Sequence, residues 1–287
     1  MYNGIFVIDK PPGMTSHDVV SRVRRILGQR KVGHGGTLDP MATGVLPIFA
    51  GRATRAADFV QSGGKTYVAG LRLGVTTDTQ DTTGAALSER PVACSRGEVE
   101  AVLQNFMGDI RQIPPMYSAL HVNGQRLYKL ARSGVEVERE ARDVRVDALR
   151  LTAQVSEREY EIEVSCSKGL YVRTLIADIG EALGYGAAMS SLRRTRAGVF
   201  TLDDAVTLED LQRLADEDRL RDKIIGADTL FADLPPLEVT DSDAEALKNG
   251  RTVSVRVDGE YRLYGGGVFL GPGRASGGRL KLEKSFY

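Results

Sequence analysis

Residues 33–47, the stretch that decides the fold, read Gly33-His34-Gly35-Gly36-Thr37-Leu38-Asp39-Pro40-Met41-Ala42-Thr43-Gly44-Val45-Leu46-Pro47. The stretch holds a single acid, and its glycines allow the backbone to approach a ligand closely. Pro40 pushes Asp39 out of the α region into an extended conformation. The apolar residues from Val45 onward predict entry into a buried core. The stretch therefore predicts one carboxylate on a stiff, bent segment, as a fixed nucleophile or base would require.

Two simpler interpretations of the same stretch compete with a catalytic loop. Asp before Pro commonly initiates a turn, so Asp39-Pro40 alone predicts no more than a loop. A glycine-rich phosphate cradle is disfavoured, because the chain has no G-x-x-x-x-G-K-[ST] and no G-x-G-x-x-G between a strand and a helix. The rest of the chain decides between these interpretations.

The overall composition is that of an ordinary globular protein. The 287 residues are 42% hydrophobic and 26% charged, with no apolar run near the length of a membrane span. The start reads as a first strand and not as a signal peptide. Two cysteines, Cys94 and Cys166, are too few for a disulfide framework or a zinc site, which predicts a reducing, cytoplasmic setting. Three histidines without ligand spacing predict no metal site.

Charge is unevenly distributed although the net charge is zero. Residues 203–247 contain 14 acidic and 4 basic side chains, so this block carries −10 and the remainder +10. Three basic clusters lie in the remainder: Arg22, Arg24, Arg25, Arg30 and Lys31; Arg193, Arg194 and Arg196; and Arg274, Arg279, Lys281 and Lys284. Single charge runs are usually solvated faces. Three runs segregated from an acidic block favour an electrostatic surface for a polyanion such as RNA.

Local patterns predict an α+β fold with antiparallel strands and interspersed helices. Strands are expected over 4–9, 65–74, 144–151 and 160–166, the last two as antiparallel neighbours. Helices are expected over 17–27 with Ser16 as N-cap, and over 52–61, about 96–107 and 207–215. A short basic amphipathic helix is expected between Gly124 and Gly134, and the run 167–176 is expected to pass into a helix that ends near Gly184. Residues 113–120 are expected to be extended, 234–237 to be a linker, and 238–287 to form a small β-rich module.

Five segments together resemble a known family. They are 10–16 (KPPGMTS), 33–47, 65–67 (KTY), 113–120 (IPPMYSAL) and 168–176 (KGLYVRTLI), in the order and spacing of the TruB-type tRNA pseudouridine synthases. These bacterial enzymes convert uridine 55 in the TΨC arm of tRNA to pseudouridine. The resemblance implies the pseudouridine synthase fold, with a mixed, largely antiparallel sheet and flanking helices. It implies a catalytic domain over 1–234 with an RNA-clamping insertion at about 124–150, and a short PUA-like module over 235–287.

The resemblance also implies roles for matched residues. Asp39 is the catalytic carboxylate, which attacks either C6 of the base or C1′ of the sugar. Arg173 pairs with Asp39. Tyr67 stacks on the flipped base, and its hydroxyl is a candidate for taking the C5 proton. The expected substrate-binding residues are His34, Tyr171, Leu192, Lys10, Gly35 and Thr37, with Lys10 either ordering the loop or binding phosphate. Taken singly, Tyr67 could be a core tyrosine, Arg173 a surface arginine, Leu192 core packing and His34 a structural histidine.

The chemistry implied for the family requires no cofactor, because isomerising uridine involves neither electron transfer nor an external energy source. The expected partner is the tRNA TΨC stem-loop, with no membrane, no obligatory protein partner and a monomeric state. Two other function classes stay open. One is an RNA-binding or tRNA-folding factor whose catalysis is secondary, and the other is a hydrolase of N-glycosides, which would release free uracil.

Overall fold

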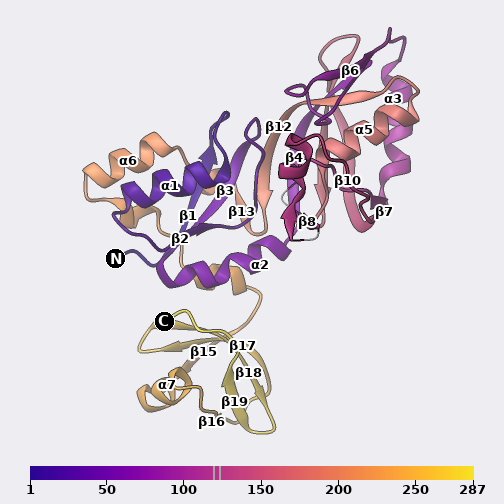
Figure 1. The fold of residues 1–287 in the computed structure, drawn as a ribbon. Coiled ribbons are helices and arrows are strands. Elements are labelled where there is room, and N and C mark those ends of the chain that lie inside the picture. Colours follow the sequence, from indigo (N-terminus) through magenta and orange to yellow (C-terminus); the bar gives the residue numbers. More distant parts are fainter. Residues whose placement is uncertain (119, 123) are drawn as a thin grey trace.

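The computed structural model describes residues 1–118, 120–122 and 124–287 and contains two β-sheet bodies (Figure 1). The larger is a ten-stranded sheet whose main order is β14-β1-β3-β12-β4-β11-β10-β7. Its strands are β1 (Gly4–Lys10), β2 (Val32–His34), β3 (Thr43–Ala50), β4 (Lys65–Leu73), β7 (Gly108–Gln112), β10 (Arg142–Gln154), β11 (Glu159–Cys166), β12 (Ala187–Ala197), β13 (Phe200–Thr201) and β14 (Ala205–Val206). Only β1–β14 and β3–β12 pair in parallel among these described strands, so the mixed, largely antiparallel α+β fold is confirmed.

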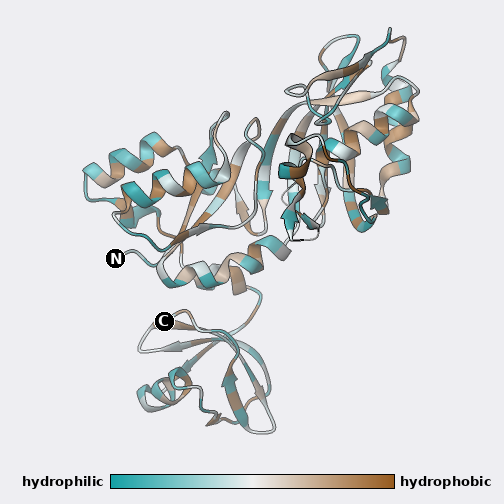
Figure 2. Ribbon diagram, viewed as in Figure 1, coloured by the Kyte–Doolittle hydropathy of each residue, from teal (hydrophilic) through white to brown (hydrophobic). Residues whose placement is uncertain are grey.

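Helices and short hairpins flank this sheet. The helices are α1 (Ser16–Ile26), α2 (Ala57–Ser62), α3 (Arg96–Leu103), α4 (Leu127–Arg132), α5 (Val172–Ala182) and α6 (Leu208–Asp216), and the hairpin strands are β5 (Val75–Thr77), β6 (Ala86–Glu89), β8 (His121–Val122) and β9 (Gln125–Arg126). Helices α1 and α6 lie side by side beside β1 and β3. Their polar residues cover much of their surface in Figure 2, while the two strands are mainly apolar. In the described part of the chain, no helix is long and apolar enough to cross a membrane.

The start of α1 differs from expectation by one residue, and the difference matters for the site. Thr15 is the N-cap and forms a capping box with Asp18. Ser16, expected as the cap, is buried, and its hydroxyl instead bonds both the N–H (2.8 Å) and the C=O (3.2 Å) of Leu38. Because Thr15 and not Ser16 caps the helix, the Ser16 hydroxyl is available to hydrogen-bond Leu38 and so connects α1 to the loop that carries Asp39.

Other boundaries also needed correction. The expected helix over 52–61 is a 3₁₀ turn (Gly51–Ala56) followed by α2, and the helix over 96–107 is α3 followed by a 3₁₀ turn (Gln104–Phe106). Strand β12 was not anticipated at all. Residues 236–237, expected as linker, open a strand. The strand expected over 144–151 is confirmed as part of β10, which also holds the end of the segment expected as an RNA-clamping insertion. Residues 113–118 are extended as expected, while residue 119 of that segment lies outside the described residues.

The C-terminal body is a five-stranded sheet with one helix. Its order is β15-β17-β18-β19-β16, built from β15 (Pro236–Val239), β16 (Val253–Ser254), β17 (Gly259–Gly265), β18 (Val268–Ser276) and β19 (Arg279–Leu282), with α7 (Asp241–Lys248). Two 3₁₀ turns, Leu220–Lys223 and Ala227–Phe231, lead into it. Phe269 and Phe286 stack at 5.7 Å and join Phe231 in a buried cluster that includes Phe49 of β3. The body is therefore packed onto the main sheet through aromatic residues.

Candidate active site

Asp39 and Arg173, which are 134 residues apart, form an ion pair. Arg173 Nε lies 2.9 Å from Asp39 Oδ2, and Nη2 donates to Oδ1 at 3.4 Å, so the guanidinium contacts both carboxylate oxygens. The two side chains differ in exposure, with 6% of Arg173 and 36% of Asp39 accessible. The pair therefore presents a carboxylate to an open space while its cation is buried behind it.

The position of Arg173 is fixed by contacts on its far side. It lies in the first turn of α5, and Nη1 donates to Thr79 C=O at 3.0 Å while Nη2 donates to Tyr117 C=O at 2.8 Å. Asp81 Oδ2 lies 4.0 Å from Nε, so a second, buried carboxylate shares the cation. Fixed main-chain acceptors and two acids leave this guanidinium little freedom to turn.

Asp81 is a site residue that sequence reasoning missed. Its Oδ1 accepts hydrogen bonds from Thr79 Oγ1 (2.9 Å), from Thr83 N–H (2.9 Å) and from the Thr83 hydroxyl. From the sequence alone, the Thr- and Asp-rich composition of residues 76–84 predicts only a polar loop. The signal that could have found Asp81 is an acid flanked at two residues on either side by threonines, which can hold a carboxylate in place.

The Asp39 loop is held by two buried cations that bind its carbonyls. Lys10 Nζ donates to the C=O groups of Pro11 (2.9 Å), Pro40 (3.2 Å) and Ala42 (2.6 Å). Burial lowers the pKa of Lys10 to about 8, although Asp39 opposes the shift. The fully buried Arg194 donates from Nε to Val45 C=O (2.7 Å) and from Nη2 to Gly36 C=O (3.2 Å). Of the two roles expected for Lys10, loop ordering fits these contacts and phosphate binding does not.

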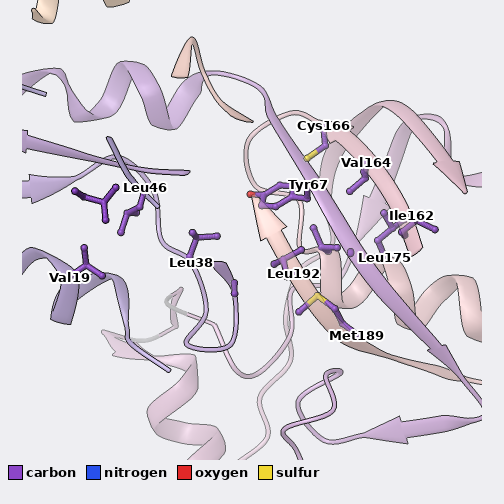
Figure 3. Close-up of a cluster of buried hydrophobic side chains, with 14 of the residues drawn as sticks. Val19, Leu38, Leu46, Tyr67, Ile162, Val164, Cys166, Leu175, Met189 and Leu192 are labelled. Carbon is purple, nitrogen blue, oxygen red and sulfur yellow. The ribbon is translucent and has the colours of Figure 1, made fainter. Parts of the chain in front are cut away.

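A cavity of about 720 Å³ opens beside the carboxylate of Asp39. Tyr67, on β4, contributes to its wall, and in Figure 3 the ring extends from the strand with its hydroxyl on the side of Leu38. Burial raises the pKa of Tyr67, and the Arg194 guanidinium opposes that rise. The lining also includes the expected Thr37, Tyr171 and Leu192, together with Leu38, Lys65, Ser118, Arg142, Lys168 and Val172. Asp39, Tyr67 and Arg173 thus meet at one cavity.

Two expected substrate-binding residues lie in the loop but do not line the cavity. A Cβ at Gly35 would meet the Phe49 ring at 2.8 Å, so this glycine permits the loop to pack on the core. His34 is the last residue of β2; its Nδ1 is buried and lacks a hydrogen-bond partner among the described residues. Burial lowers the pKa of His34, with Arg194 adding to the effect.

The expected basic cluster at 193–196 is not a free RNA-binding surface. Arg194 is buried, Arg193 Nη2 lies 2.8 Å from Asp9 Oδ2, and Arg196 donates to the Thr66 hydroxyl and Gly198 C=O. These residues belong to β12, at the centre of the sheet, where arginine side chains reach neighbouring strands. The cations that line the cavity in the described part of the chain are Arg173 itself and Lys65, Arg142 and Lys168. Among the residues that the structure describes, His, Cys, Asp and Glu side chains do not gather into a metal-binding group.

Solved structures define the class of fold. The crystal structure of a Cbf5–Nop10–Gar1 complex superposes with a TM-score of 0.75 at 29% identity, covering 99% of this chain and 85% of that chain. The archaeal box H/ACA sRNP Nop10–Cbf5 complex gives 0.72 at 27% identity, covering 99% and 86%. The architecture is therefore the mixed α+β pseudouridine synthase fold seen in Cbf5.

Sequence comparisons identify the family. Residues 24–172 match the TruB family pseudouridylate synthase N-terminal domain, and residues 173–232 match the tRNA pseudouridylate synthase B C-terminal domain. The tRNA pseudouridine synthase B of Azoarcus sp. strain BH72 is 45% identical, covering 98% of this chain and 94% of the relative. That of Geobacillus thermodenitrificans is 47% identical, covering 86% and 84%. The chain belongs to the TruB family of pseudouridylate synthases and is an isomerase.

Proposed function

We propose that this enzyme converts uridine 55 in the TΨC arm of tRNA to pseudouridine. The observation that carries the proposal is the Asp39–Arg173 pair at the cavity that Tyr67 lines. Its relatives are named tRNA pseudouridine synthase B, which supports tRNA as the substrate. A structurally similar H/ACA RNP is bound to a substrate RNA containing 2′-deoxyuridine, which supports an RNA nucleotide in such a cavity.

In this proposal the chemistry needs one carboxylate. The N1–C1′ bond breaks, the uracil turns, C5 bonds to C1′, and the proton on C5 leaves while N1 gains one, so atoms balance without a cofactor. Asp39 attacks the base or the sugar, and attack at C6 and attack at C1′ both fit a carboxylate at the cavity wall. Arg173 fixes the orientation of this carboxylate through contacts with both of its oxygens. The high pKa of Tyr67 keeps its ring neutral at physiological pH, as suits a stacking face for the flipped base.

RNA binding in this proposal uses shape and positive charge. The uridine must leave its stack, and the cavity volume of about 720 Å³ is sufficient for a nucleotide. The exposed Arg142 and Lys168 of the cavity lining provide positive charge for the backbone phosphates on either side. The C-terminal module, as a PUA-like domain, would add contacts outside the TΨC loop, and the protein would act as a monomer in the cytoplasm.

The decisive experiment compares wild type with Asp39→Asn, which keeps the size and polarity of the side chain. An unmodified tRNA transcript is incubated with each protein without cofactor, and pseudouridine is mapped at single-nucleotide resolution. We expect modification of the TΨC-arm uridine by wild type and a rate lower by more than about 10³-fold for Asp39→Asn. Asp203→Asn, an exposed change on the acidic block, is the matched control and retains the wild-type rate.

Other outcomes would favour the competing functions. Release of free uracil by wild type would indicate an N-glycoside hydrolase. Tight tRNA binding by both proteins with no modification by either would indicate an RNA-binding or tRNA-folding factor. Equal modification by wild type and Asp39→Asn would remove Asp39 from the chemistry and contradict the proposed site.

A further inference from the structure

Gln112, the last residue of β7, binds the main chain of Tyr171 with both ends of its side-chain amide. Its Nε2 donates to Tyr171 C=O at 3.3 Å, and its Oε1 accepts from Tyr171 N–H at 3.1 Å. The glutamine is 2% exposed. The side chain takes the place of a neighbouring strand, because it satisfies the N–H and the C=O of one residue together.

Tyr171 is the N-cap of α5, so its main chain sets where this helix begins. Among the described residues, no side chain makes a capping hydrogen bond at this end, and tyrosine is not a residue that caps helices well. Tyr171 C=O also accepts from Leu175 N–H at 3.0 Å, which closes the first turn. Arg173 lies in that turn. Gln112 therefore fixes the main chain two residues from the guanidinium that contacts Asp39.

The segment that follows Gln112 contacts the start of α5 at two further points. The Ser118 side chain is hydrogen-bonded to the Tyr171 hydroxyl, and Tyr117 C=O accepts from Arg173 Nη2 at 2.8 Å. The segment thus holds the main chain of the cap residue, its ring and the nearby guanidinium. Its end at Gln112 belongs to the main sheet, so the start of α5 is held against a rigid element.

We propose that Gln112 is a positioning residue for the reaction, which keeps Arg173 in the orientation that contacts both oxygens of Asp39. This inference rests on the proposed function, because it takes the Asp39–Arg173 pair to be catalytic. A guanidinium contacts both oxygens of a carboxylate only in a narrow range of orientations. Small displacements of a catalytic group lower the rate strongly. Loss of the Gln112 amide therefore slows the chemical step and spares tRNA affinity.

Gln29 is a matched control, because it makes the same pair of hydrogen bonds elsewhere in the molecule. Its Nε2 donates to Tyr2 C=O at 3.1 Å, its Oε1 accepts from Tyr2 N–H at 2.8 Å, and it is 9% exposed. Neither Gln29 nor Tyr2 is among the described residues that line the cavity. Leucine in place of either glutamine removes one buried amide and two hydrogen bonds. We expect similar falls in Tm for Gln29→Leu and Gln112→Leu.

The test measures single-turnover rates and tRNA Kd for both variants in the wild-type and Arg173→Lys backgrounds. We expect Gln112→Leu to lower the rate about ten- to thirtyfold, with Kd within about twofold of wild type, and Gln29→Leu to change neither. A lysine cannot contact both oxygens as a fork, so Gln112→Leu should cause less than about a twofold further loss in that background. Equal rate losses for the two glutamine variants, a wild-type rate in Gln112→Leu, or the same loss in both backgrounds would overturn the inference.

Gln112→Glu keeps the inference testable if Gln112→Leu does not fold. A carboxylate accepts from Tyr171 N–H but cannot donate to its C=O, whereas the protonated acid does both. Burial raises the pKa of a carboxyl group, so we expect the rate relative to wild type to rise as the pH falls from about 8 to about 6. A constant ratio over this range would contradict the role of Gln112. If wild type forms no pseudouridine in this tRNA, or Asp39→Asn retains the wild-type rate, the proposed function fails instead, so the two failures are distinct.

Discussion

At the scale of single residues, two neighbouring positions on β12 show how environment decides the role of an arginine. Arg193 is 42% exposed at its side chain and pairs with Asp9, whereas Arg194 is fully buried and binds carbonyls of the Asp39 loop. A Cβ on Gly44 would meet Arg194 C=O at 2.2 Å, so only glycine lets the loop pass this strand. The buried guanidinium and the glycine together fix where the loop crosses the sheet.

Arg194→Met should therefore destabilise the protein strongly. The loop carbonyls of Gly36 and Val45 would lose their donor, which predicts a loss of about 3–5 kcal/mol in the free energy of unfolding. Arg193→Met, the adjacent control, removes only a partly exposed ion pair and should cost less than about 1 kcal/mol. Chemical denaturation of both variants measures the difference. Similar losses for the two variants would contradict the distinct roles assigned to them.

At the scale of elements, α1 is joined to the catalytic loop through Ser16 and is capped separately by Thr15. The two adjacent hydroxyls can thus be tested against each other. Ser16→Ala leaves the Leu38 N–H without its partner, so we expect a loss of about 2 kcal/mol in stability. Because Leu38 directly precedes Asp39, we also expect a kcat about tenfold lower.

Thr15→Ala serves as the control for that change. It removes the N-cap and should cost about 1 kcal/mol of stability. It leaves the hydrogen bonds to Leu38 intact, so kcat should stay within twofold of wild type. A fall in kcat of equal size in both variants would show that α1 influences catalysis through its general stability and not through Ser16.

Elements with strong periodic patterns could be predicted from the sequence, and those with misleading side chains could not. The alternation in 144–151 and 160–166 correctly indicated adjacent strands β10 and β11. Strand β12 was missed because its arginines were interpreted as a surface cluster. In the structure, residues of the strands on either side accept hydrogen bonds from these arginines. The start of β15 was missed because Pro235 and Pro236 predict a break in regular secondary structure. Proline can nevertheless be the first residue of an edge strand, as Pro236 is in β15.

The residues of the candidate site also divide into those that could be predicted from the sequence and those that could not. Asp39, Tyr67 and Arg173 lie in segments distinctive enough to be singled out from the sequence, and the structure brings all three to one cavity. Asp81 was missed because its relevance depends on its contact with the distant Arg173, and the flanking threonines are only a weak local signal of a fixed carboxylate. A buried acid beside Arg173 becomes visible only when the chain is folded.

At the scale of the whole molecule, the C-terminal module is joined to the sheet by Phe231, Phe269 and Phe286. Phe286 is 3% exposed, so Phe286→Ala should lower stability by about 3 kcal/mol and increase proteolysis near residues 232–235. The control Tyr287→Phe removes only an exposed hydroxyl bond to Lys248 and should cost less than about 1 kcal/mol. Denaturation and limited proteolysis would check both, and an unchanged cleavage rate in Phe286→Ala would contradict the role of the cluster.

The central place of β12 has a consequence for how the protein is made. This strand lies between β3 and β4, although the chain reaches it only after some 180 residues. On the ribosome, strands that emerge early must wait for a late one before the sheet can close. A nascent chain that has exposed the Asp39 loop still lacks the buried Arg194 that supports it. The catalytic loop is thus among the first segments synthesised and among the last to acquire its final environment.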